Sequence, residues 1–155
     1  MKMYNSILVI LVFLVGCVGM ASHNVQKEFT YDFLLPGKTQ NVLWQNARDY
    51  FAGAYGDSRI VFRVADEKDS TLIGRGLAPW MLISNNCTVE YHIRFAAKDG
   101  KARLQYELIE GVIGQGSCPG WPWPSEEGYK EITQSFSDTA KNLEHALKGN
   151  NFKDF

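Results

Sequence analysis

The chain has 155 residues, with 16 basic and 17 acidic side chains and a formal net charge of −1 at pH 7. This length suits one domain whose hydrophobic core can be stable without disulfides or bound metals. The balanced charge and the lack of a basic block argue against a nucleic-acid partner, because nucleic-acid binding depends on neutralising phosphates.

The first segment has Lys2 followed by an apolar run at positions 7–15. A basic residue before a short apolar core is typical of a bacterial secretory signal, and this core is too short for a membrane span, which needs about 20 apolar residues. The sequence Leu-Val-Gly-Cys at positions 14–17 resembles the bacterial lipobox, in which the cysteine is acylated and the chain is cut just before it. We therefore expect residues 1–16 to be a lipoprotein signal peptide and Cys17 to be the lipidation site.

Two other fates of the first segment stay open, namely ordinary signal cleavage after Ala21 and an uncleaved anchor or buried helix. With the lipobox, residues 17–28 form the lipidated cysteine and a flexible tether, and several acyl chains attach a protein to a membrane more stably than one. The expected location is then the bacterial cell envelope. No acidic residue directly follows Cys17, which favours the outer membrane, facing the periplasm or the surface.

Two further cysteines, Cys87 and Cys118, remain if Cys17 is lipidated. Outside the cytoplasm such a pair can form a lasting disulfide. The alternative is two separate thiols. No second Cys or His lies at ligand spacing near either residue, so we expect no metal site and no cofactor.

The domain is expected to span residues 29–149 and to begin with a β-rich strand at 29–35, which Pro36-Gly37 ends. Residues 38–55 place apolar side chains at three- and four-residue steps, which predicts a helix. Thr39 is its expected N-cap. Trp44 flanks the apolar stripe and is expected to pack under it.

Residues 58–67 and 71–80 predict two strands joined by a turn at 66–70. The glycines of Gly74-Arg75-Gly76 favour a bulge or the close approach of another backbone, and a phosphate-binding loop is disfavoured because no helix follows them. Alternation in the first of these strands is expected to separate two sets: Ile60, Phe62 and Val64 on one face, and Arg59, Val61 and Arg63 on the other.

A β-hairpin is predicted from residues 87–95 and 101–110, which alternate strictly and flank Asp99-Gly100, a favoured type I′ turn. With Asp99 and Gly100 as the turn residues, the numbers of opposed positions sum to 199. Every apolar side chain then meets an apolar one, and a slip by one residue would expose the core face. The predicted pairs are Phe95 with Leu104, Ile93 with Tyr106, Tyr91 with Leu108, and His92 with Glu107.

Residues 111–124 are rich in Gly and Pro and form a loop with two tryptophans, which we call the Trp loop. A long amphipathic helix is predicted from 125 to 149, with Ser125 as its N-cap and acidic residues in its first turn. Gly149 is a candidate C-cap. Residues 150–155 are expected to fray.

The chain resembles the bacterial lipoprotein-type family of domain of unknown function 4468 over residues 27–110. The matching features are the helix with Trp44 after Pro36-Gly37-Lys38, the segment Leu-Ile-Gly-Arg-Gly at 72–76, and the hairpin at 89–108. The resemblance implies a TBP-like α+β fold: a curved antiparallel sheet of about five strands with two helices packed on one face, in the order β-α-β-β-β-β-α. It implies no activity, and DNA binding is not carried over because a fold does not fix a function.

The open face of this sheet, away from the helices, is one candidate site. Its mixture of arginine and glutamate can bind an anionic peptide or glycan, or can simply be solvated. The side chains expected on it are Arg59, Arg63, Glu90, His92, Arg94, Arg103, Gln105 and Glu107.

Trp121 and Trp123 of the Trp loop are the second candidate, with Trp80 as an extension of the same patch. Exposed indoles on a stiff Pro-rich loop suit contact with a protein, a glycan or a lipid interface, because they combine an apolar body with a polar edge. In the alternative, both rings fold back and cap the core.

His92 and Glu107 are the third candidate, as a general acid–base pair. The alternative is a cross-strand polar pair without catalytic work. No nucleophile or metalloprotease motif accompanies them, so we do not expect an enzyme.

The sequence thus predicts an envelope lipoprotein held at the membrane by its lipid anchor. Its expected role is a non-catalytic binding or interaction module that uses the Trp loop and the open sheet face for a protein or glycan partner. A structural envelope protein without a small ligand is the alternative, and a hydrolase-type enzyme using His92 and Glu107 is a further one.

Overall fold

The computed structural model describes residues 24–55, 60–111 and 118–149, without the side chains of residues 60 and 61. Several predictions from the sequence concern residues outside these ranges. They are the signal peptide at 1–16, lipidation of Cys17, cleavage after Ala21, the position of Arg59 and the frayed tail at 150–155. All of them stay predictions.

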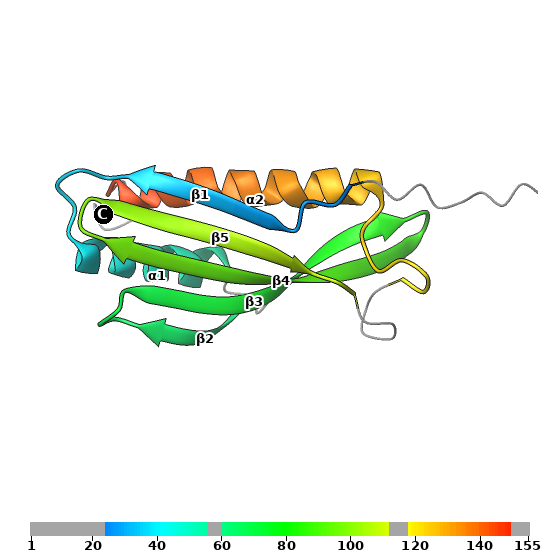
Figure 1. The fold of residues 1–155 in the computed structure, drawn as a ribbon, viewed down its shortest axis with the longest axis horizontal. Coiled ribbons are helices and arrows are strands. Elements are labelled where there is room, and N and C mark those ends of the chain that lie inside the picture. The colour runs from blue at the N-terminus through cyan, green and yellow to red at the C-terminus, as the bar shows by residue number, and fades with distance from the viewer. Residues whose placement is uncertain (1–23, 56–59, 112–117, 150–155) are drawn as a thin grey trace, which may run out of the picture.

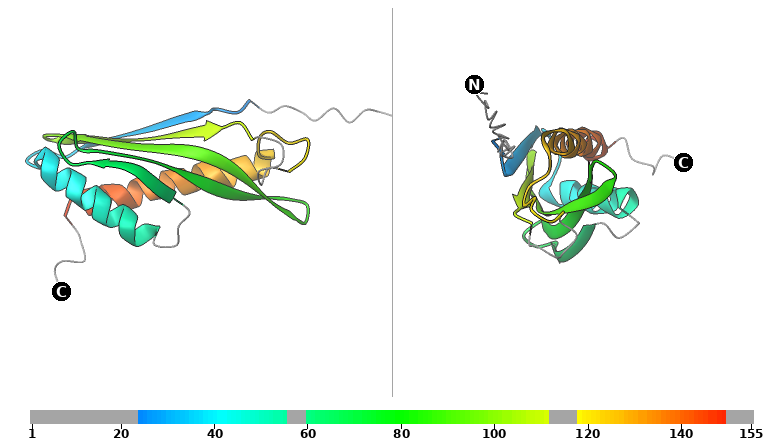
Figure 2. Two further views of the ribbon diagram at one scale, coloured as in Figure 1. Left: turned by 90° about the horizontal axis from the view of Figure 1, so that it is seen from below. Right: turned by 90° about the vertical axis from the view of Figure 1, so that its right-hand side faces the viewer.

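Five strands and two helices follow the predicted order and confirm the α+β, TBP-like fold class (Figure 1). The strands form one antiparallel sheet in the spatial order β1-β5-β4-β3-β2. Figure 2 shows both helices on one side of the curved sheet, so the other face is open. The elements are β1 (Glu28–Leu34), α1 (Gln40–Ala54), β2 (Ile60–Asp66), β3 (Thr71–Leu82), β4 (Asn85–Lys98), β5 (Lys101–Ile109) and α2 (Glu126–Leu147).

Both helices begin at the predicted caps. The Thr39 hydroxyl accepts a hydrogen bond from the amide of Val42 at 3.4 Å, and the Ser125 hydroxyl accepts one from the amide of Gly128 at 3.2 Å. Each bond satisfies an amide that has no partner inside the helix. Trp44 of α1 is buried as expected, and its indole N–H donates to the carbonyl of Thr71.

The predicted register of the β4–β5 hairpin is confirmed. Phe95 pairs with Leu104, and His92 pairs with Glu107, as do the other residues whose numbers sum to 199. The odd-numbered residues of β4 from 87 to 97 and the even-numbered residues of β5 are buried against the helices. The open face therefore carries the even-numbered residues of β4 and the odd-numbered residues of β5.

The alternation expected in β2 breaks at a bulge. Phe62 pairs with Gly74, whereas Val64 pairs with Ile73, so Arg63 is an extra residue in this strand. The prediction that Val64 shares the face of Phe62 is wrong, because a bulge shifts the period of two. Phe62 packs on Phe51 of α1, and Val64 is exposed.

β3 extends to Leu82, two residues beyond its predicted end at Trp80. β2 covers only Thr71–Gly76 of it, so the remainder pairs with β4 alone and forms a protruding hairpin. Pro79 lies in this remainder, and proline, which has no N–H to donate, is tolerated at a sheet edge. Within the described ranges, neither helix has the length and apolar character needed to cross a membrane.

The end of the predicted tether belongs to the folded domain. The carbonyl of Gln26 accepts a hydrogen bond from the Tyr129 hydroxyl at 3.1 Å, and that of Lys27 accepts one from the Leu108 amide at 2.8 Å. Val25 packs against the core. The polar sequence of this segment does not predict its docking on the domain. Two of the contacts are made by backbone carbonyls, which a pattern of side chains does not reveal.

Candidate functional site

A groove of about 430 Å³ lies on the open face of the sheet. The side chains of Ile93 and Tyr106 are buried toward the helices, so these residues contribute only backbone to its floor. The lining residues come from all five strands: Glu28, Thr30, Arg63, Ile73, Gly74, Arg75, His92, Ile93, Arg94, Gln105, Tyr106 and Glu107.

One row of side chains crosses the groove through the strand pairing. Thr30 pairs with Gln105, Gln105 with Arg94, and Arg94 with Ile73. Arg63, the extra residue of the bulge in β2, also lines the groove and follows directly on this row. The row therefore places an apolar side chain beside two arginines.

A second, parallel row is more acidic. Glu28 pairs with Glu107, Glu107 with His92, and His92 with Arg75. Arg75 forms an ion pair with Glu90, with 2.9 Å between Nη1 and Oε1. The positive charge of Arg75 is thus already balanced within the sheet.

Arg63 and Arg94 have no ion-pair or hydrogen-bond partner for their side chains within the described part of the chain. Arg103, on the same face but outside the groove, is different, because it forms two hydrogen bonds of 2.6 and 2.9 Å with the carboxylate of Asp32. The hydrogen bond from Arg103 holds the pKa of Asp32 below its ordinary value. The groove therefore holds two arginines whose charge is available to a ligand.

The predicted arginines thus separate into three groups. Arg63 and Arg94 line the groove, Arg103 is occupied by Asp32, and Arg59 is outside the described residues. Arg75 also lines the groove, although it was not predicted as a site residue. Its signal was available, because a two-residue turn at Ile83-Ser84 would pair Arg75 with His92, as the structure does.

Trp80 is wrongly predicted as part of an exposed patch. It is only 3% exposed, because β3 continues past it and its position alternates toward the helices. Trp121 and Trp123 are half-buried and pack against the core, and the ring of Trp121 lies 6.2 Å from that of Trp80. None of these three residues lines the groove, so the Trp loop and the groove are separate surfaces.

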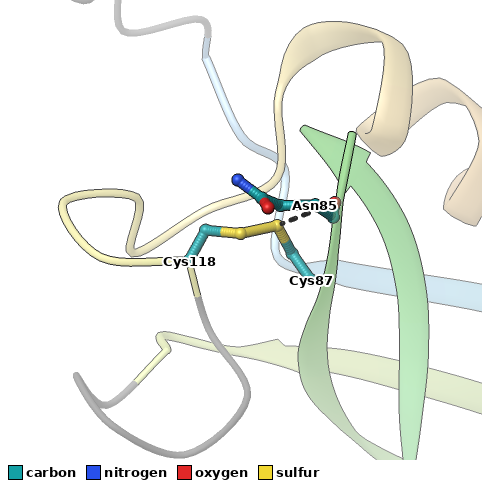
Figure 3. The surroundings of a disulfide bond; sticks show 3 residues. All are labelled: Asn85, Cys87 and Cys118. Carbon is teal, nitrogen blue, oxygen red and sulfur yellow. Dashed lines mark hydrogen bonds between the residues drawn. A yellow bond between two sulfur atoms is a disulfide. The ribbon is translucent and has the colours of Figure 1, made fainter. Parts of the chain in front are cut away.

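The Trp loop is held by a disulfide between Cys87 of β4 and Cys118, which was one of the two alternatives from the sequence (Figure 3). The Cα atoms are 5.4 Å apart and the residues are 31 positions apart in the chain. This bond fixes the loop beside the protruding β3–β4 hairpin.

His92 and Glu107 face each other with 3.7 Å between Nδ1 and Oε2, and Nε2 of His92 is 3.9 Å from Oε1 of Glu90. Both distances exceed a hydrogen bond, and both side chains of the predicted pair are about half exposed. This geometry fits a cross-strand polar pair, because the two residues are opposed in the β4–β5 register and both side chains are open to solvent. The described residues contain no cluster of three His, Cys, Asp or Glu side chains suited to a metal ion.

Comparison with known proteins identifies the fold. The family model of the domain of unknown function (DUF4468) with TBP-like fold matches residues 29–110, more than half of the chain. A TBP-like protein from Parabacteroides distasonis has a TM-score of 0.55 at 7% identity, covering 79% of this chain and 92% of that chain. A DUF4468 family protein from Bacteroides ovatus has a TM-score of 0.50 at 15% identity, covering 85% and 92%. Such low identities show a common fold alone, and no curated protein matches.

Proposed function

Since the chain belongs to the DUF4468 family, a domain of unknown function with a TBP-like fold, we propose its function from the groove: a non-catalytic binding module that takes an anionic group of a protein or glycan partner. The observation that carries this proposal is the pair Arg63 and Arg94. Both line the groove, and neither has a charged partner among the residues that the structure describes.

Guanidinium groups suit this task because their planar N–H donors match a carboxylate or phosphate in a bidentate contact. Ile73 lies beside Arg94 in the same row and offers an apolar surface for the uncharged part of the ligand. In the second row, Glu28 and Glu107 repel a further anion. We therefore expect one anionic group at the Arg94 row, with the remainder of the ligand extending over Ile73.

The bacterial envelope is the proposed location, with Cys17 as the lipid anchor. The lipobox-like sequence at 14–17 supports it. The Cys87–Cys118 disulfide also supports it, because disulfides persist in compartments outside the cytoplasm and are rare within it.

The alternatives use the same face differently. In a structural protein without a small ligand, the charges of Arg63 and Arg94 would have no binding role. A hydrolase would use His92 and Glu107. The half-exposed side chains and long separation of the latter pair favour binding over acid–base work.

Calorimetric titration tests the binding proposal with two carboxylate probes, an oligogalacturonate and an oligoglutamate peptide. Maltotriose and oligoglutamine serve as their neutral counterparts. At low salt we expect one of the anionic probes to bind and both neutral ones to fail, and the Arg94→Gln variant to bind that probe at least about tenfold more weakly.

Arg103→Gln is the matched control, because Arg103 lies on the same face but outside the groove and is paired with Asp32. Its affinity for the anionic probe should stay within about twofold of the original chain. Equal losses in the two variants would show nonspecific charge attraction, and no binding of either probe would refute the proposal.

A further inference from the structure

Two neighbouring segments at one end of the domain contain no charged residues. Residues 77–89, the protruding part of the β3–β4 hairpin, contain no Asp, Glu, Lys, Arg or His, and neither do residues 118–125 of the Trp loop and helix cap. The Cys87–Cys118 disulfide joins these two segments (Figure 3). In a chain with 21% charged residues, these two segments are distinct in having none.

Ile83 at the tip of this hairpin is unfavourable in two respects. Its side chain is 96% exposed, and its φ angle is +57°, a left-handed conformation that β-branched residues rarely adopt. The turn joins the paired residues Leu82 and Asn85, a position where Gly or Asn would fit without strain. Backbone strain of this kind is often found at sites that serve a function other than folding.

Other side chains at this end share an affinity for an apolar interface. Met81, two residues before Ile83, is 51% exposed, and Trp121 and Trp123 are half-buried in the adjacent loop. Tryptophan rings favour the boundary between lipid and water, with their apolar body inward and their N–H outward.

The N-terminal side of the described chain meets this same end. Nζ of Lys27 lies 4.8 Å from the ring centre of Trp123, and Figure 1 shows the start of β1 beside the Trp loop. A lipid on Cys17 would keep Asn24 within about 25 Å of the bilayer, because seven extended residues reach no farther. The two uncharged segments are thus at the end of the domain that such an anchor would bring to the membrane.

We propose that the hairpin tip at residues 81–84, together with Trp121 and Trp123, rests in the interface of the bilayer that holds the N-terminal anchor. This inference depends on the lipid-anchor part of the proposed function and is independent of the groove. Insertion of Ile83 and Met81 removes apolar surface from water, and the hairpin tip itself carries no charged side chain that would have to be desolvated. Lys27, which lies over Trp123, can keep its ammonium group at the level of the lipid headgroups.

The test uses the full chain reconstituted in vesicles of phosphatidylethanolamine and phosphatidylglycerol, with and without bromine atoms on the acyl chains. Bromine quenches tryptophan emission at short range, while Trp44, buried in the core beside Thr71, gives a constant background. We expect brominated lipid to quench the emission, and the double variant Ile83→Asn, Met81→Asn to lose most of this quenching.

Leu34→Asn is the matched control, because Leu34 is 81% exposed at the opposite end of the molecule, where β1 ends (Figure 1). It should leave the quenching unchanged. The single variant Ile83→Asn should raise the urea midpoint of unfolding, because Asn tolerates a positive φ. A variant that is more stable and yet less quenched has lost membrane contact and has not misfolded.

Three outcomes would overturn the proposal: a chain that does not float with the vesicles, a floating chain whose emission ignores bromine, and equal quenching in the double variant. An apolar protein partner at this end would give the second outcome. The double variant should keep its affinity for the anionic probe, so failure here and failure of the groove proposal are distinguishable.

Discussion

Gly128 at the start of α2 lies directly against Trp80 of β3, so that a Cβ atom placed on Gly128 would be 2.8 Å from the Cβ of Trp80. Real Cβ atoms do not come so close, and both residues are buried. The absence of a side chain at position 128 therefore allows α2 to approach the sheet, and Trp80 forms part of this contact.

Replacing Gly128 by Ala should lower the free energy of unfolding by about 1–3 kcal/mol, the usual range for overpacking a core. The sign is informative because Ala is favoured over Gly inside a helix by about 1 kcal/mol. Gly53→Ala in α1 is the matched control, since beyond its chain neighbours and its own helix backbone no atom lies within 4 Å of the added Cβ. Urea unfolding of both variants should show a loss at position 128 and a gain at 53, and gains at both would contradict the packing described.

The Cys87–Cys118 disulfide closes a long stretch of chain and restricts the unfolded state. With the cysteines 31 positions apart, its removal should lower the free energy of unfolding by about 3–4 kcal/mol. The measurement is urea unfolding of the oxidised chain, the reduced chain and the double variant Cys87→Ala, Cys118→Ala. Equal stability of the oxidised and reduced chains would contradict a stapling role for this bond.

Two buried tyrosines should make the protein sensitive to alkaline pH. Desolvation by burial, with repulsion from Tyr55 adding to it, raises the pKa of Tyr91 and of Tyr106. Unfolded tyrosine titrates near pH 10. Above that pH the unfolded chain has released both protons while the folded chain keeps them, so stability that is fully present below about pH 10 falls as pH rises. These two residues contribute about 2.7 kcal/mol per pH unit, and Tyr50, whose pKa burial raises to about 12, adds at most about 1.4 kcal/mol per pH unit below that value.

Urea unfolding at a series of pH values around and above 10, combined with phenolate absorbance, measures this dependence. Tyr91→Phe should lower the slope by about 1.4 kcal/mol per pH unit, because unfolding then releases one proton fewer. Full phenolate absorbance in a chain that is still folded would show that these hydroxyls are not shielded by burial.

The sequence was sufficient to predict strand register where a local turn and a regular hydrophobic pattern agree. Asp99-Gly100 and the alternation on both sides of it determine the β4–β5 register, including the pairing of His92 with Glu107. Both helix caps were predictable as well, because Thr39 and Ser125 each precede an amphipathic stripe and bond an amide of the first turn.

Prediction failed where one strand depends on another. The bulge at Arg63 arises in the pairing of β2 with β3, and the alternation within β2 gives no sign of it. Trp80 was misplaced because the end of β3 was set two residues early, before the turn at Ile83-Ser84 was considered. The groove could not be predicted without the spatial order of all five strands. Only that order makes Ile73 and Arg94 neighbours.

The most direct test of the central claim is an NMR titration of the isotope-labelled protein with whichever carboxylate probe binds in calorimetry, recorded on backbone amides and arginine Nε–H groups. Binding in the groove should give the largest shifts at Ile73, Arg94 and Arg63, while the Nε–H of Arg103 stays in place. Shifts confined to Trp121 and Trp123, or spread evenly over the surface, would contradict it and remove the groove as the binding site.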